Sequence, residues 1–134
     1  MPHLVILYTR NLDAETDMKG LCRSLCDTLL DVRDEQDGQP FPTGGTRVLA
    51  FASDHHAIAD GRHDYAFVYL NLRMARGRSE AVKKATGEAL SAAARAHFGK
   101  LLDQRYIGIT LQIDEGQEVY DVKHSSIHPL FRKG

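Results

Sequence analysis

Four short apolar runs divide the chain, and each has the composition of a β-strand. They cover residues 3–9, 46–52, 65–72 and 106–113, where leucine, β-branched and aromatic residues are frequent. Each run is shorter than a typical globular helix and is bounded by polar or glycine-containing segments. We therefore predict four strands.

Between these runs lie two segments whose apolar residues recur every three or four positions, which is the spacing of an amphipathic helix. Asp17 and Ser79 stand at the starts of these segments and are the expected N-caps. The glycine- and proline-rich residues 34–45 end the first helix. The expected buried face of the first helix is Met18, Leu21, Cys22, Leu25, Cys26, Leu29 and Val32, and that of the second is Val82, Ala85, Ala89, Leu90, Ala93, Ala94, Phe98, Leu101 and Leu102.

The order strand, helix, strand occurs twice, which predicts two βαβ units in tandem. The predicted fold class is α/β (α+β), with a four-stranded sheet and both helices on one face, because crossovers are right-handed. We expect a single domain over residues 1–134, with units at about 2–60 and 64–114 and a C-terminal tail at 115–134. The third and fourth strands are too apolar to face water on the uncovered side of the sheet, so an oligomer is predicted.

The charge balance narrows the possible partners. The chain has 17 basic and 18 acidic residues and a net charge of −1, which argues against a nucleic-acid binder and a polybasic membrane anchor. No apolar run is long enough to cross a bilayer, and no basic segment leads into an apolar signal core. We expect a cytoplasmic protein with no nucleic-acid or membrane partner.

Metal and cofactor motifs are weak in this sequence. The two cysteines lie four residues apart on the apolar face of the first predicted helix and are expected to be small buried hydrophobes. The adjacent histidines at 55–56 would point to opposite faces of a strand, and His124 and His128 have no accompanying carboxylate motif. The TGGT run at 43–46 lacks the lysine of a phosphate-binding loop. We expect no metal and no cofactor, which leaves acid/base chemistry.

Pro2, Arg47 and Arg78 are the candidate catalytic residues. Removal of Met1 leaves Pro2 as a secondary amine at the head of a core strand, where a fixed amine is suited to act as a general base. Arg47 enters the second strand and Arg78 precedes the N-cap of the second helix, and both places suit a guanidinium that binds carboxylate. The pKa of a terminal amine starts near about 8, and that of a proline amine is expected to be higher. Nearby cations and burial lower it, so a fall of about one to two units would give a base at neutral pH. Arg73 and Arg76 make the same loop more positive.

Five motifs occur in a recognisable order along nearly the whole chain. They are MPH at 1–3, FPTGGTR at 41–47, ADGRHDYAFV at 59–68, GRS at 77–79 and HPLF at 128–131. Together they resemble the 5-carboxymethyl-2-hydroxymuconate isomerase family of the tautomerase superfamily. A single motif such as the proline at position 2 would be far less specific.

The resemblance implies a fold of two βαβ units, a homotrimer, and no cofactor or metal. It also implies an isomerase that converts a dienol to an unsaturated ketone in homoprotocatechuate catabolism. By position, Pro2 becomes the base, and Arg47 and Arg78 become the residues that bind substrate carboxylates and polarise the developing carbonyl. The implied partner is a small anionic di- or tricarboxylate bound between subunits, and the subunit that supplies each arginine is left open.

Two alternatives remain at this point. One is a tautomerase for another 2-hydroxymuconate or enol/keto acid, since small pocket changes redirect specificity by only a few kcal/mol. The other is a non-enzymatic oligomeric module that binds an anion or nucleic acid through the loop at 73–78. The net charge of −1 and the absence of interleaved aromatic and basic residues weigh against the second.

Overall fold

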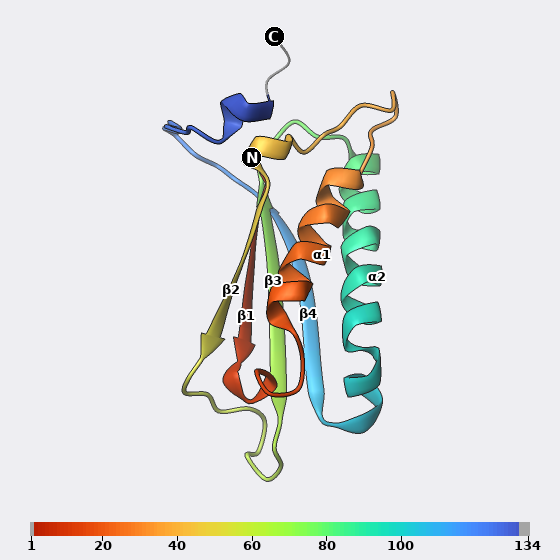
Figure 1. The fold of residues 1–134 in the computed structure, drawn as a ribbon, viewed down its shortest axis with the longest axis vertical. Helices are drawn as coiled ribbons and strands as arrows, with labels where there is room; N and C mark the ends of the chain where they lie inside the picture. Colours follow the sequence, from red (N-terminus) through yellow and green to blue (C-terminus); the bar gives the residue numbers. More distant parts are fainter. Residues whose placement is uncertain (1, 132–134) are drawn as a thin grey trace.

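A computed structural model describes residues 2–131 as a four-stranded sheet with two long helices on one face (Figure 1). The regular elements are β1 (His3–Thr9), α1 (Met18–Asp31), β2 (Arg47–Ser53), β3 (Ala66–Met74), α2 (Glu80–Gln104) and β4 (Ile107–Glu115). Within the described residues there are also three short 3-10 helices: η1 (Arg10–Leu12) and η2 (Thr43–Gly45) in connecting segments, and η3 (His128–Phe131) after the last strand. The predicted elements are confirmed, with shifts of one or two residues at strand ends.

The strand order in the sheet is β2-β1-β3-β4. β1 is parallel to β2, and β3 is parallel to β4, so each βαβ unit is internally parallel. The two units join through antiparallel pairing of β1 with β3. The start of β1 therefore lies beside the start of β2 and the end of β3. The predicted tandem βαβ architecture is confirmed. The antiparallel pairing of the two units through β1 and β3 was not predicted from the sequence.

Both helices begin at the N-caps expected from the sequence. The Asp17 side chain accepts a hydrogen bond from the Gly20 N–H at 3.0 Å, and the Ser79 side chain accepts one from the Val82 N–H at 3.2 Å. These caps satisfy donors that the first helical turn leaves unpaired.

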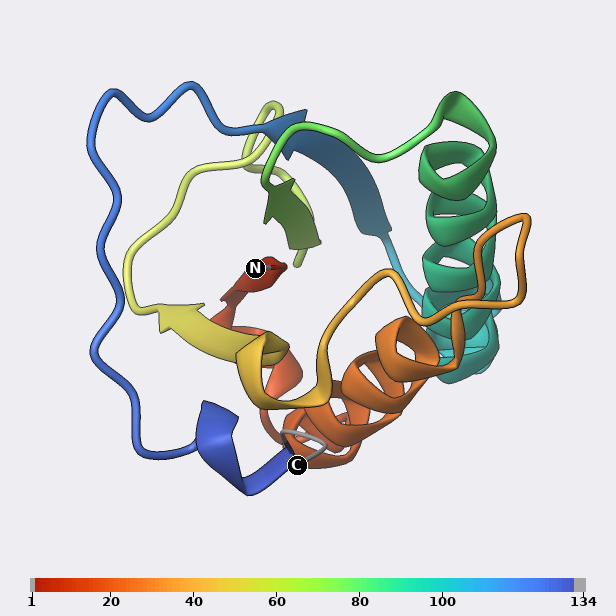
Figure 2. The same cartoon turned by 90° about the horizontal axis from the view of Figure 1, so that it is seen from above.

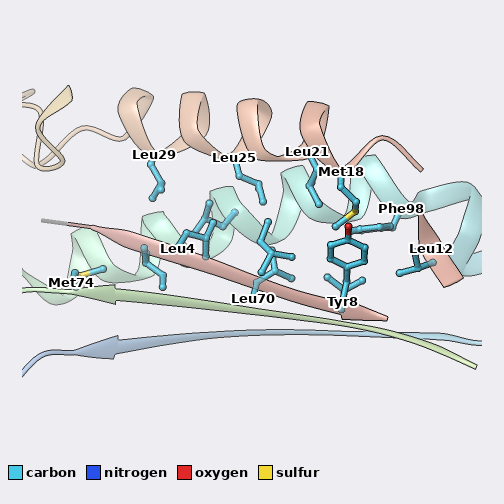
Figure 3. Close-up of a cluster of buried hydrophobic side chains, with 14 of the residues drawn as sticks. Leu4, Tyr8, Leu12, Met18, Leu21, Leu25, Leu29, Leu70, Met74 and Phe98 are labelled. Carbon is cyan, nitrogen blue, oxygen red and sulfur yellow. The ribbon is translucent and has the colours of Figure 1, made fainter. Parts of the chain in front are cut away.

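The core lies between the sheet and the two helices (Figure 3). Alternate residues of β1 and β3 face the helices and are fully or almost fully buried, and the leucines of α1 pack over them. Two expectations for α2 were wrong. Leu102 is 41% exposed and Ala85 is exposed, whereas Thr86 is buried because its hydroxyl donates to the Val82 carbonyl at 2.7 Å. The fully buried hydrophobic residues of the core include Leu4, Ile6, Leu21, Leu25, Leu29, Val68, Leu70, Leu72, Leu90 and Phe98.

The uncovered face of the sheet is apolar mainly on β1 and β2. Leu7, Leu49 and Phe51 are 48%, 42% and 52% exposed there. On β3 and β4 this face carries polar pairs, since the Tyr69 hydroxyl donates to the Gln112 side chain at 2.8 Å. The apolar surface that predicted an oligomer is therefore placed on different strands from those expected. Among the described residues, neither long helix combines the length and apolarity needed to span a membrane.

The segment after β4, residues 116–131, makes a wide arc around the uncovered side of the sheet (Figure 2). This C-terminal arc ends in η3, which lies next to η2. The sequence predicted apolar anchors at Val119, Val122, Ile127, Leu130 and Phe131. This expectation was wrong within the single chain, because each of these side chains is more than half exposed. Backbone contact holds the end of the arc instead: a Cβ added to Gly44 would lie 2.6 Å from the Cα of His128.

We predict that Gly44→Ala detaches η3 from η2, because the added methyl group would lie 2.6 Å from the Cα of His128 and that backbone would have to move away. Overpacking of this kind costs about 1–3 kcal/mol, which corresponds to roughly a fivefold to hundredfold rise in the open population. The measurement is the rate of limited tryptic cleavage after Lys123. Gly87→Ala is the matched control, since its added Cβ would meet only Ile113 at an ordinary 3.5 Å. Equal cleavage rates in the two variants would contradict the close packing of η3.

Candidate functional site

A row of charged and polar residues crosses the sheet at the end where β1 begins. His3 pairs in register with Arg47 of β2 on one side and with Arg73 of β3 on the other, and Arg73 pairs with Asp114 of β4. Paired residues on adjacent strands project to the same face of a sheet. Leu4 faces the helices, so the row lies on the uncovered face. Two arginines from different strands are thereby placed on either side of His3.

Pro2 lies immediately before this row and is buried. β1 is held on both sides by β2 and β3, so Pro2 stands at the head of a central strand. This is the position that the sequence analysis expected. Arg47 and Arg73 pair in register with His3, the residue after Pro2, so two guanidinium groups lie one position along from it. Arg73 is paired with Glu118, so the local charge is mixed.

The Arg47 guanidinium is oriented by β1. Its Nε–H donates to Nδ1 of His3 at 2.9 Å, and Nη1 donates weakly to the Gly45 carbonyl at 3.5 Å. The bond to His3 requires an unprotonated Nδ1. Partial burial and the adjacent Arg47 charge lower the pKa of His3, which favours that neutral state.

A cavity of ≈ 190 Å³ opens beside this row. His3, Arg47 and Arg73 line one side, and residues of the C-terminal arc line the other. Arg73 pairs with Glu118 of the arc at 3.3 Å. The full lining is His3, Arg47, Arg73, Met74, Ala75, Glu118, Asp121 and Lys123. The arc therefore contributes a cation and two carboxylates to the cavity.

Arg78 is held at the same end of the sheet by contacts with two loops. It donates to the Pro40 carbonyl at 2.8 Å and to the Ala75 carbonyl at 3.2 Å, and its guanidinium carbon lies 4.7 Å from the centre of the Phe41 ring. Burial lowers the pKa of Arg78. Its Nε is buried and has no hydrogen-bond partner among the described residues. Arg78 therefore fastens the loop after β3 to the loop before β2.

A second cavity, of ≈ 610 Å³, lies on the other side of the loop after β3. Arg76, Arg78 and Lys83 supply its cations, and Asp114 and Glu115 its carboxylates. Lys83 is already paired with Glu115 at 3.1 Å. The structure thus places Arg47 at the smaller cavity and Arg78 at the larger one within the same chain. Pro2 lies one residue before His3, which lines the smaller cavity.

Sequence reasoning missed His3 and the arc residues. The position of His3 could have been predicted from the sequence. His3 starts the first strand and Arg47 starts the second, and the first residues of two paired parallel strands lie side by side. No sequence pattern predicts that Glu118, Asp121 and Lys123 line the cavity, because they lie in an irregular segment whose path the sequence does not indicate. Within the described residues, no group of three or more histidine, cysteine, aspartate or glutamate side chains is placed to hold a metal ion.

The arrangement suits chemistry on a small polyanion. Fixed guanidinium groups bind carboxylates in bidentate geometry and stabilise negative charge that develops on an enol or carbonyl oxygen. A buried amine among cations is disfavoured in its protonated form.

Two βαβ units joined through antiparallel β1 and β3, with Pro2 at the head of β1, place the chain in the tautomerase superfamily. The model of the 5-carboxymethyl-2-hydroxymuconate isomerase family matches residues 2–131. The chain belongs to this family and is an isomerase of it.

Individual relatives agree with this assignment. A 5-carboxymethyl-2-hydroxymuconate Delta-isomerase of Escherichia coli is 30% identical over 132 residues, which cover 98% of this chain and 100% of the relative. A crystal structure of a 5-carboxymethyl-2-hydroxymuconate delta-isomerase is 56% identical with a TM-score of 0.95, and the match covers 100% of this chain and 95% of that one. A 5-carboxymethyl-2-hydroxymuconate isomerase from Deinococcus radiodurans R1 is 38% identical with a TM-score of 0.87, covering 98% and 95% of the two chains.

We predict that Arg78→Lys lowers the free energy of unfolding by about 1–2 kcal/mol, because an ammonium lacks the planar fork that reaches both carbonyls and stacks on Phe41. Urea unfolding at one fixed protein concentration measures the loss. Arg76→Lys is the matched control, since Arg76 is exposed on the same loop. A stability loss no larger in Arg78→Lys than in Arg76→Lys would contradict the fastening role.

Proposed function

We propose that this protein converts 5-carboxymethyl-2-hydroxymuconate to its conjugated ketone in homoprotocatechuate catabolism, with the Pro2 amine as general base. The amine removes the proton of the enol hydroxyl, and the oxygen electron pair forms the ketone. The electrons of the diene move along the chain, and the carbon at its far end takes the proton back from the Pro2 ammonium. No atom is gained or lost, so the reaction is an isomerisation.

The observation that carries the proposal is the position of Pro2 beside the row formed by Arg47, His3 and Arg73. Once Met1 is removed, the amine lies at the head of a central strand rather than on a frayed terminus. Burial opposes its protonation, and so does the positive charge of Arg47, which pairs in register with the next residue. An amine tuned in this way remains a base near neutral pH.

Arg47 and Arg78 are the proposed receptors for substrate carboxylates, and they also stabilise the negative oxygen that forms during proton transfer. Arg47 has its Nε bound to His3, which leaves the outer edge of the guanidinium available. Arg78 lines the larger cavity, and the N–H groups of its terminal nitrogens that Pro40 and Ala75 do not use are the proposed donors to the substrate. A substrate with three carboxylates matches a site that contains several separate cations.

The proposed assembly is a homotrimer with sites between subunits. The exposed Leu7, Leu49 and Phe51 give the uncovered face of the sheet an apolar patch that a neighbouring subunit would bury. The apolar side chains of the C-terminal arc face outward at the same time. A neighbouring subunit would cover both, and it would bring its own arginines to the cavities of the first.

We predict that Pro2→Ala lowers kcat by about a hundredfold to ten-thousandfold, the usual contribution of a positioned general base. The loss arises because the ring no longer fixes the amine. The measurement follows the ultraviolet absorbance of 5-carboxymethyl-2-hydroxymuconate during conversion, using protein whose intact mass shows that Met1 is absent. Light scattering on the same samples checks that the assembly is preserved.

Protein that retains Met1 is the internal control, since its Pro2 nitrogen is an amide and is expected to be inactive. Rates on substrates with one, two and three carboxylates report how far the arginines select the tricarboxylate. Equal conversion by the unaltered protein and Pro2→Ala, or by protein with and without Met1, would contradict the proposed base.

A further inference from the structure

We infer that His3 is a positioning residue that orients Arg47 to receive a substrate carboxylate, so that protonation of the imidazole weakens substrate binding. The inference rests on the proposed function of Arg47 as a carboxylate receptor. It assigns a role to the side chain of the residue that follows Pro2.

The geometry fixes one edge of the Arg47 guanidinium. Arg47 and His3 are paired in register on adjacent parallel strands, and their side chains meet through the 2.9 Å bond from Nε–H to Nδ1. An arginine has four further N–H groups on its two terminal nitrogens. Nε is held by His3 and Nη1 contacts the Gly45 carbonyl, so the remaining terminal N–H groups are available to a ligand. The ≈ 190 Å³ cavity, which both residues line, is the space available to a bound carboxylate.

Arg47 has little else to hold it in place. It is exposed, and within residues 2–131 its other hydrogen bond is the long 3.5 Å contact with the Gly45 carbonyl. An exposed arginine loses side-chain entropy when it is fixed by a ligand. Because His3 fixes the side chain beforehand, the substrate loses less binding free energy to ordering it.

The bond depends on the protonation state of His3. A neutral imidazole with the proton on Nε2 accepts from Arg47, whereas an imidazolium has donors on both nitrogens and repels the guanidinium. Neighbouring elements decide which state is favoured. Arg47 faces His3 from β2 and Arg73 faces it from β3, while Glu118, Asp121 and Lys123 line the same cavity from the arc, and Asp114 lies further along the row on β4.

The sign of the pH effect follows from these contacts. Burial and Arg47 lower the pKa of His3 below its ordinary value of 6.5. The orienting bond is therefore complete at neutral pH and is lost as the pH falls through that lowered pKa. Substrate affinity decreases over the same range. A histidine that bound the carboxylate directly would give the opposite result, because its imidazolium would attract the anion.

The test compares His3→Ala with His3→Asn in the full chain without Met1. Asparagine places its side-chain oxygen close to the position of Nδ1 and accepts the same bond without titrating. At pH 7.5, His3→Ala is expected to raise KM by about three- to tenfold, the value of one hydrogen bond, with a smaller change in kcat. His3→Asn is expected to restore most of the lost affinity. His55→Ala, on an exposed loop, is the matched control.

A second measurement keeps this test separate from the proposed reaction. Calorimetry gives the Kd of propane-1,2,3-tricarboxylate, an unreactive tricarboxylate, for the same proteins at pH 7.5 and 5.0. We expect binding by the unaltered protein to weaken at pH 5.0 more than binding by His3→Asn. If turnover is absent but this pattern remains, the proposed reaction fails and the inference stands. Three results would each overturn the inference. The first is that KM and Kd are equal in His3→Ala and the unaltered protein. The second is that the unaltered protein alone binds the tricarboxylate more tightly at pH 5.0 than at pH 7.5, and the third is that the tricarboxylate does not bind.

Discussion

The site depends on one constraint, which is the position of β1 between a parallel partner and an antiparallel one. Parallel pairing with β2 brings the start of β2 to the start of β1, and antiparallel pairing with β3 brings the end of β3 to the same place. Pro2, His3, Arg47 and Arg73 meet at one end of the sheet for this reason, although they are far apart in sequence. Because β1 is central, His3 is paired on both sides and the residue before it is held in place, which is the rigidity that the proposed base requires.

Two kinds of structure then complete the site. The sheet supplies fixed positions for His3 and Arg47, whereas the loop after β3 and the C-terminal arc supply Arg78 and Lys123. The net charge of −1 does not reveal this arrangement, in which several of the chain's cations lie at the end of the sheet where β1 begins. The concentration of guanidinium groups serves two purposes in the proposed reaction: it attracts a polyanion, and it opposes protonation of the amine.

The sequence predicted the fold well because the helical and strand periodicities are strong and each helix has a clear N-cap. The placement of Pro2 and Arg47 at one end of the sheet was also predictable, since both stand at the start of strands. The contacts of Arg78 with Pro40 and Phe41 were not, because they join loops whose paths no periodicity encodes. The arc was misjudged for a related reason: its apolar residues suggested anchors, but they have no place in the core of their own chain.

The measurement that tests the central claim most directly is a pH titration of the Pro2 nitrogen by NMR, in protein labelled with ¹⁵N-proline and free of Met1. The account predicts a single titration whose pKa lies clearly below the ordinary α-amine value of about 8, and a rise toward that value in Arg47→Gln. A Pro2 pKa at or above about 8 would contradict the claim that burial and the neighbouring guanidinium groups make this amine a base at neutral pH. An Arg47→Gln variant with no change in the Pro2 pKa would contradict the part assigned to Arg47.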